Sequence, residues 1–198
     1  MTVHFDGLGP ANTMEVLRLC RERAEELGIR TIIVATTKGD TAILASEMFR
    51  GYRVVVVTHS TGFKEPDFQE VTEEIQATVK GNGATVLTTT HALGGVGRAV
   101  RRKFNTMQLE ELIAHTLRIL GAGMKVVCEI AVMAADAGLA RTDEDAIIIS
   151  GSGRGADTAV ILRPVHAQDF FDMRVKEIIC RPRLRSVAET KAMAAARA

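Results

Sequence analysis

The 198-residue sequence lacks tryptophan, has a single tyrosine, and contains only 4% aromatic residues. Proteins that stack on nucleic-acid bases use aromatic side chains as platforms, so we expect no such platform here. An excess of positive charge is also missing, because 25 lysines and arginines stand against 24 acidic residues. A net charge of +1 gives no electrostatic reason to expect binding to DNA or RNA.

Cysteine is scarce too, and its three positions (Cys20, Cys128 and Cys180) are far apart. This spacing fits neither a metal site nor a disulfide framework, so we expect a reducing, cytoplasmic environment and no bound metal. The first residues lack the basic and apolar segments of a signal peptide. No apolar run is long enough to span a bilayer, so we expect no membrane partner.

The length and the hydrophobic content of 46% suit a single globular domain. Helical patterns and β-branched runs alternate, and the run at 53–58 is apolar on both faces, as in a covered parallel sheet. The segment 158–162 follows the strand at 146–150 too closely for a crossover helix, so it should return antiparallel. The order of the expected helices and strands along the sequence predicts a three-layer α/β/α sandwich with a mostly parallel sheet and an antiparallel edge strand. We expect one domain over residues 1–183 and a helical or disordered tail over 184–198.

A polar turn follows the expected strand at 31–35 and leads directly into a helix. Its hydroxyl, ammonium and glycine groups suit a phosphate, because the first N–H groups of a helix lack partners and its dipole favours anions. Asp40 supports the alternative, in which its carboxylate caps the helix and repels an anion. The candidate phosphate-binding residues are Thr36, Thr37, Lys38, Gly39, Asp40 and Thr41.

Three further loops, at 58–63, 89–98 and 150–157, are rich in glycine, hydroxyl groups and histidine. Loops that follow parallel strands emerge at one end of the sheet, so we expect all four loops to form a shared small-molecule site. The alternative is four solvated turns. The candidate residues in these loops and at the start of the next strand are Thr58, His59, Gly62, Phe63, His91, Gly95, Gly97, Arg98, Gly153, Gly155, Asp157 and Thr158.

His59 and His91 each lie in a loop that follows a strand, where two histidines can act as acid and base near pH 7. They can equally stack on a ligand ring or bond to the backbone. We favour binding, because no activated nucleophile is evident nearby. Arg98 and Arg154 can each pair with a phosphate or form a surface salt bridge.

Glu129 and Asp136 are seven residues apart on an otherwise apolar helix, and such charges need partners. For Glu129 we favour an ion pair with a lysine or arginine of a neighbouring element. For Asp136 a position at the rim of the site and an ion pair remain equally open.

The segment from Ile32 to Thr58 resembles the C-terminal α/β domain of pyruvate kinase, as does the glycine-rich hairpin at 150–160. In that domain a strand ends in a Thr/Ser-rich turn, a helix follows, and a valine-rich strand ends in threonine. The resemblance implies a mixed five-stranded sheet with helices on both faces. In pyruvate kinase the turn holds a phosphate of a sugar bisphosphate effector, and it corresponds here to Thr36, Thr37, Lys38, Gly39 and Thr41. No catalytic barrel is present, so phosphoryl transfer to ADP is not expected.

Four stretches (58–63, 91–98, 129–138 and 155–159) also resemble a stand-alone prokaryotic family with this fold. That family is associated with bound flavin mononucleotide (FMN) and has no established reaction. The resemblance implies an FMN-binding protein in which the Thr36–Thr41 turn holds the phosphate and the other loops hold the ribityl chain and the ring. The alternatives are a phosphosugar sensor and a structural domain with a vestigial site. We also expect a homo-oligomer, because the long apolar helices leave much surface to bury.

Overall fold

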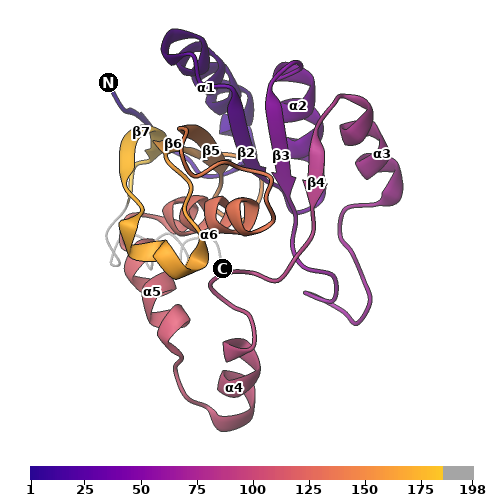
Figure 1. Cartoon of the computed structure of the whole chain (residues 1–198), viewed down its shortest axis with the longest axis vertical. Helices are drawn as coiled ribbons and strands as arrows, with labels where there is room; N and C mark the ends of the chain where they lie inside the picture. Colours follow the sequence, from indigo (N-terminus) through magenta and orange to yellow (C-terminus); the bar gives the residue numbers. More distant parts are fainter. Residues whose placement is uncertain (185–198) are drawn as a thin grey trace, which may run out of the picture.

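The computed structural model describes residues 1–184 and contains one seven-stranded sheet with helices on both faces (Figure 1). The strand order across the sheet is β1-β7-β6-β5-β2-β3-β4. The strands are β1 (Val3–Phe5), β2 (Thr31–Ala35), β3 (Arg53–Val57), β4 (Thr85–Leu87), β5 (Ala146–Ser150), β6 (Thr158–Leu162) and β7 (Val175–Pro182). The helices are α1 (Thr13–Leu27), α2 (Asp40–Met48), α3 (Glu73–Gly81), α4 (Gly97–Phe104), α5 (Leu109–Arg118) and α6 (Ala122–Asp136), with short 3-10 helices η1 (Pro10–Asn12) and η2 (Ala167–Asp172).

The predicted α/β fold with a mostly parallel sheet is confirmed, but its antiparallel strand does not lie at the edge of the sheet. β6 runs antiparallel to both β5 and β7, and therefore lies inside the sheet. The sheet has seven strands rather than five because β7 and β1 extend it beyond β6. Val3 of β1 pairs in parallel with Cys180 of β7, so the chain's first residues form a strand that no local pattern indicated. The expected tail, apart from Leu184, lies outside the described residues.

The strands alternate their side chains between two apolar layers, as the pleat requires. Ile32 and Val34 of β2 pack on the side of α1 and α2, whereas Ile33 packs on the side of α6. The second layer depends on α6, which is buried along nearly its whole length and packs against β2, β3, β5 and β6. A helix that is apolar on nearly every side is buried in this way.

Helices α4 and α5 form an arm that extends away from the sheet beyond α6 (Figure 1). The segment of α4 was expected to be loop up to Arg98, and the helix was missed because it buries no residue and so shows no core-facing stripe. α5 packs against α6, and α4 packs against α5. The arm therefore begins at Gly97, directly beside the loop that follows β4.

Candidate functional site

A cavity of about 230 Å³ lies at the carboxyl ends of β2 and β3, against α6. The four loops predicted to converge do so, since each of them contributes to its wall. α6 supplies the rest of the lining, including Lys125, Val126, Glu129, Ile130 and Met133. The sequence-predicted residues that line the cavity are Thr36, Thr37, Thr41, Thr58, His59, Phe63, His91, Arg98, Gly153 and Gly155.

The turn after β2 is held by a hydrogen bond within itself. Gly39 N–H donates to Thr36 Oγ1 at 3.0 Å, and the left-handed φ of +105° at Gly39 makes this turn possible. A Cβ at Gly39 would lie 2.4 Å from Ile75 Cγ2, so α3 packs too closely for any side chain here. Thr37 and Thr41 leave their hydroxyl-bearing side chains on the cavity wall, whereas Lys38 is exposed and lies outside the lining.

Asp40 does not cap the helix that it begins. The N-cap residue of α2 is Gly39, and no side chain makes a capping hydrogen bond there. The Asp40 carboxylate instead accepts a hydrogen bond from Arg154 Nη2 at 2.7 Å. The alternative in which Asp40 occupies the helix amides is therefore wrong, and Arg154 adopts the salt bridge that was one of its two expected roles.

Three cations face the cavity: Arg98, Arg118 and Lys125. Lys125 Nζ donates to Glu129 Oε2, and Glu129 Oε1 accepts the N–H of Leu93 at 3.1 Å. Burial lowers the pKa of Lys125, and Glu129 opposes this shift. Among the described residues of the lining, Glu129 is the single acidic one, so these residues together carry a net positive charge. The expected ion pair of Glu129 is present, but its partner lies four residues earlier on the same helix instead of on a neighbouring element.

The two arginines of the cavity come from the two helices of the arm. Arg98 lies over the Phe63 ring, with 4.9 Å between Cζ and the ring centroid. Within residues 1–184, neither Arg98 nor Arg118 is placed in a salt bridge. Guanidinium groups without a carboxylate partner at a cavity are available for an anionic ligand.

Three rings lie together at the β3 and β4 side of the cavity. The His59 and Phe63 centroids are 4.3 Å apart, and those of Phe63 and His91 are 5.0 Å apart. His91 Nε2 accepts the backbone N–H of Ser60 at 3.3 Å. Burial lowers the pKa of His91 to about 4, so this imidazole is neutral at pH 7.

The carboxylate of Glu70 contacts this ring cluster through His59, and the sequence analysis did not identify Glu70 as a site residue. Its carboxylate side chain is only 3% exposed and contacts His59 Nδ1 at 2.5 Å and Lys64 Nζ at 3.0 Å. Burial alone would raise the pKa of Glu70, but His59 and Lys64 lower it overall. α3 begins at Glu73, after its N-cap Thr72, so Glu70 lies in the loop before this helix. No signal in the sequence separated Glu70 from the acidic residues around it.

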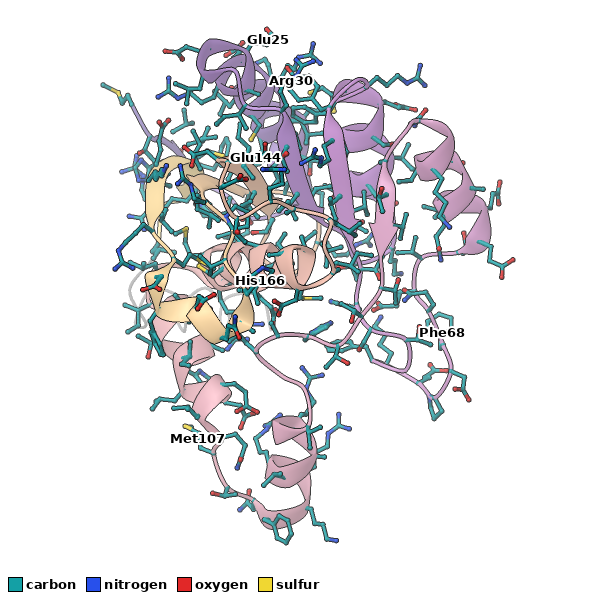
Figure 2. The ribbon with its side chains drawn as sticks, viewed as in Figure 1. Glu25, Arg30, Phe68, Met107, Glu144 and His166 are labelled. Carbon is teal, nitrogen blue, oxygen red and sulfur yellow. The ribbon has the colours of Figure 1, made fainter. Side chains whose placement is uncertain are left out.

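Several predicted residues lie outside the cavity lining. Gly62 and Gly95 line an adjoining hollow of about 320 Å³ that shares the side chains of Phe63, His91 and Arg98. Asp136 also lies outside the lining. Its Oδ1 contacts Nδ1 of His166 (labelled in Figure 2) at 3.0 Å and accepts the N–H of Ala167 at 3.2 Å. The other residues outside the lining are Lys38, Gly39, Asp40, Gly97, Asp157 and Thr158.

Asp157 is buried and serves the loops rather than the cavity. Its Oδ2 accepts the N–H groups of Gly9 and Ser152, each at 3.0 Å, and its Oδ1 accepts the hydroxyl of Thr158 at 2.8 Å. These bonds tie the β5–β6 loop to the start of the chain. Gly153 and Gly155 thereby obtain a fixed place on the cavity wall.

Within the described residues, no group of three or more histidine, cysteine, aspartate or glutamate side chains is arranged to hold a metal ion. Cys20, Cys128 and Cys180 are free and buried. None of the helices in residues 1–184 is long and apolar enough to cross a membrane.

Comparison with known proteins gives a family match over most of the chain. Residues 14–162 match the family described as "Pyruvate kinase, alpha/beta domain". Among solved structures, the pyruvate kinase of Cryptosporidium parvum in complex with ADP is similar, with 16% identity over 76% of this chain and a TM-score of 0.41. Another crystal structure of C. parvum pyruvate kinase matches with 16% identity, the same coverage of this chain and a TM-score of 0.39. The aligned part spans only 23% and 22% of those longer chains.

Proposed function

This chain belongs to the pyruvate kinase alpha/beta domain family, and from that premise we propose that its cavity binds a small molecule through a phosphate group. The observation that carries the proposal is the lining itself. Thr36, Thr37, Thr41 and three cationic residues line one space, and the described lining includes a single carboxylate. Hydroxyl groups and helix amides bind phosphate oxygens, and arginine adds charge-assisted hydrogen bonds.

FMN is the first ligand that we propose. Its phosphate would be held by the turn after β2, and its ring would be placed at the His59, Phe63 and His91 cluster, where aromatic faces offer stacking. The flavin would supply redox chemistry, while the protein would supply orientation and charge. The volume limits this arrangement. A cavity of about 230 Å³ is below the roughly 300–1,000 Å³ typical of sites for drug-sized ligands, so part of FMN would extend beyond it.

That same volume favours a second candidate, a sugar phosphate or another small phosphorylated metabolite. Such a ligand would fit its phosphate and carbon chain within the cavity. The protein would then act as a phosphometabolite sensor or as an enzyme on a small substrate. Whether FMN or a smaller phosphate compound binds is therefore the first question for experiment.

Titration of FMN against the purified protein tests the first ligand, because flavin fluorescence and absorbance change on binding. A thermal-shift screen with FMN, riboflavin, sugar monophosphates and sugar bisphosphates tests both candidates in one experiment. Stabilisation by FMN but not riboflavin supports phosphate-anchored flavin binding. Stabilisation by sugar phosphates alone supports the second candidate. If no phosphate compound stabilises the protein, the proposal is wrong.

Variants locate the site. Thr41→Val removes a cavity hydroxyl at nearly constant volume, and Arg118→Met removes an exposed cavity cation. Both should weaken binding of the stabilising ligand about tenfold, the loss expected for one or two charge-assisted hydrogen bonds. Thr78→Val, on α3 and outside the lining, and Arg174→Met, beyond η2, are the matched controls and should bind as the wild type does.

We also propose that the protein forms a homo-oligomer. The arm exposes apolar side chains, among them Met107 at 61% (labelled in Figure 2), Leu109 at 73% and Leu112 at 54%. Clustered exposed apolar residues mark interaction surfaces. A Met107→Lys/Leu109→Lys double variant should reduce the mass measured by light scattering. Phe68→Ser, on the loop after β3 (also labelled in Figure 2), is the control and should leave that mass unchanged.

A further inference from the structure

The ring cluster contains an arrangement that ligand binding does not require. The buried carboxylate of Glu70 contacts His59 Nδ1 through Oε2, and its Oε1 lies 3.0 Å from Lys64 Nζ. The segment that carries Glu70 is also held to His59 by its backbone, because Gln69 Nε2 donates to the carbonyl oxygen of His59 at 3.0 Å and Gln69 Oε1 accepts the N–H of Val71. With Nδ1 engaged, Nε2 is the ring nitrogen that His59 can offer to a ligand in the cavity.

A carboxylate that orients one nitrogen of a histidine leaves the other nitrogen to exchange protons. The carboxylate fixes the tautomer with the proton on Nδ1, and it stabilises the imidazolium that forms when Nε2 takes up a proton. The side chain of His59 is 30% exposed and lines the cavity, so a bound molecule can reach it.

Groups that stabilise a developing oxyanion lie on the same cavity wall. His91 accepts a hydrogen bond at Nε2, so its neutral ring carries the proton on Nδ1, where it can donate. Lys125 and Arg98 supply positive charge at the same cavity. A neutral imidazole donor and cations in a partly buried site are the groups that stabilise the negative oxygen of an enolate.

The phosphate turn and His59 follow neighbouring strands at the same end of the sheet. β2 and β3 are neighbours, and Thr36 N–H donates to the carbonyl oxygen of Val57, two residues before His59. Adjacent strands lie about 4.8 Å apart, so the turn and His59 follow neighbouring strands and line the same cavity. A small compound whose phosphate is held by the turn would therefore have its carbon chain in the same cavity as the ring of His59.

We propose that this cavity is a proton-transfer site, in which His59 positioned by Glu70 acts as general base on a small phosphorylated ketone or aldehyde. His59 Nε2 takes the proton from the carbon next to the carbonyl group. The electron pair of that C–H bond forms a carbon–carbon double bond, and the carbonyl π electrons move to oxygen, giving an enolate. Return of the proton from His59 to carbon restores a carbonyl compound, so no oxidant, reductant or further reactant is consumed. The proposal rests on the phosphate binding proposed above.

Proton exchange in D₂O tests this without knowledge of the complete reaction. Dihydroxyacetone phosphate is the probe, and ¹H NMR follows the loss of its carbon-bound hydrogens next to the carbonyl. The wild-type protein should accelerate deuterium incorporation over buffer. His59→Gln should reduce that rate by about 10²–10⁴-fold, the usual contribution of a general base. His115→Gln, on the exposed surface of α5, is the control and should exchange at the wild-type rate.

Glu70→Gln separates positioning from binding. The amide keeps the shape of the side chain but cannot stabilise an imidazolium, so kcat for exchange should fall at least roughly tenfold while KM stays unchanged. A merely structural role for Glu70 would alter KM or the melting temperature instead. A loss confined to KM would therefore remove Glu70 from the mechanism.

Binding of the same probe is measured in parallel by calorimetry, which keeps the two proposals apart. Binding with exchange that depends on His59 supports both. Binding without exchange above buffer overturns the proton-transfer site and leaves the phosphate-binding proposal standing. Exchange that persists in His59→Gln overturns the role of His59. Neither binding nor exchange of the probe overturns the proton-transfer site, and the thermal-shift screen then decides on phosphate binding independently.

Discussion

Arg154, in the loop between β5 and β6, pairs with Asp40 at the first residue of α2, with 2.7 Å between Nη2 and Oδ2. The pair joins two of the four loops around the cavity. It also turns the Asp40 carboxylate away from the helix amides, where it would compete with an anion. The charge of Asp40 nevertheless stays next to the turn that we propose for phosphate.

Asp40→Asn should therefore strengthen binding of a phosphate ligand a few-fold, because a nearby negative charge is removed. Stability should change by less than about 1 kcal/mol, since exposed ion pairs contribute little. The side chains of Asp40 and Arg154 are 70% and 55% exposed, which places the pair in that class. Calorimetric titration with the ligand identified by thermal shift measures the first effect, and urea unfolding measures the second.

The control for this variant is Asp143→Asn, which breaks a similarly exposed pair with Arg141 outside the cavity lining. It should leave ligand affinity unchanged. Equal affinities for wild type and Asp40→Asn at low salt would contradict a phosphate at this turn.

The buried pair of Lys125 and Glu129 should behave differently from a surface pair of the same spacing. Both side chains are largely buried, 10% and 6% exposed, and Glu129 also accepts the N–H of Leu93. Glu129→Gln leaves a buried ammonium without its counter-charge, so unfolding free energy should fall by about 3 kcal/mol. Glu22→Gln breaks the exposed pair of Arg18 and Glu22, also four residues apart, and should leave the unfolding free energy almost unchanged.

Chemical denaturation compares the two variants. The Lys125→Met/Glu129→Leu double variant should recover part of the loss, because no unpaired charge remains. A cost for Glu129→Gln no larger than that for Glu22→Gln would show that the cavity solvates Lys125 well enough to make its partner dispensable.

Two glycines of the β5–β6 loop allow the cost of a left-handed backbone conformation to be compared with the cost of a steric clash. Gly153 and Gly155 both have left-handed φ angles, +100° and +68°. A Cβ at Gly153 meets nothing within 4 Å, whereas at Gly155 it would lie 2.4 Å from Pro10 Cα and 2.6 Å from Pro10 N. Gly153→Ala should cost about 1–2 kcal/mol from conformation alone. Gly155→Ala should cost clearly more, because the backbone of η1 has to move; equal melting temperatures for the two variants would contradict this.

The strands that build the sheet's centre were predictable from sequence because their signals are local. The apolar runs of β2, β3 and β5 are bounded by polar turns, and their observed bounds agree closely with the expected ones. The pairing of β1 with β7 was not predictable, because it joins Val3 to Cys180 across almost the whole chain. The antiparallel β6 was therefore placed at an edge that β7 and β1 in fact cover.

The candidate site was predictable as a place but only in part as a set of residues. The rule that loops after parallel strands share one end of the sheet brought Thr36, His59 and His91 together correctly. It could not supply Arg118 or Lys125, because helices α5 and α6 approach the cavity from the face of the sheet. It also could not show that the Asp157 carboxylate accepts backbone N–H groups. One of these belongs to Gly9, which is distant from Asp157 in the sequence.

His91 makes the stability of the protein sensitive to mild acid. Its pKa in the folded state is about 4, against 6.5 for an ordinary histidine, and the first cause is burial. Between these values the unfolded chain binds a proton that the folded protein excludes. The contribution of His91 is therefore fully present above pH 6.5 and is lost as the pH falls toward 4.

Urea unfolding at pH 7 and pH 4.5 should show this loss, and a His91→Gln variant should lose less stability than the wild type between the two pH values. The difference should be about 1–2 kcal/mol, allowing for partial solvent access to the ring. His115→Gln is the control for removal of an imidazole, because its side chain is exposed on the arm. An NMR titration of the His91 ring reports the same property directly, with a midpoint near pH 4 expected. A midpoint near 6.5 would mean that the ring is solvated, and it would then be a cation rather than a neutral donor at the cavity in mild acid.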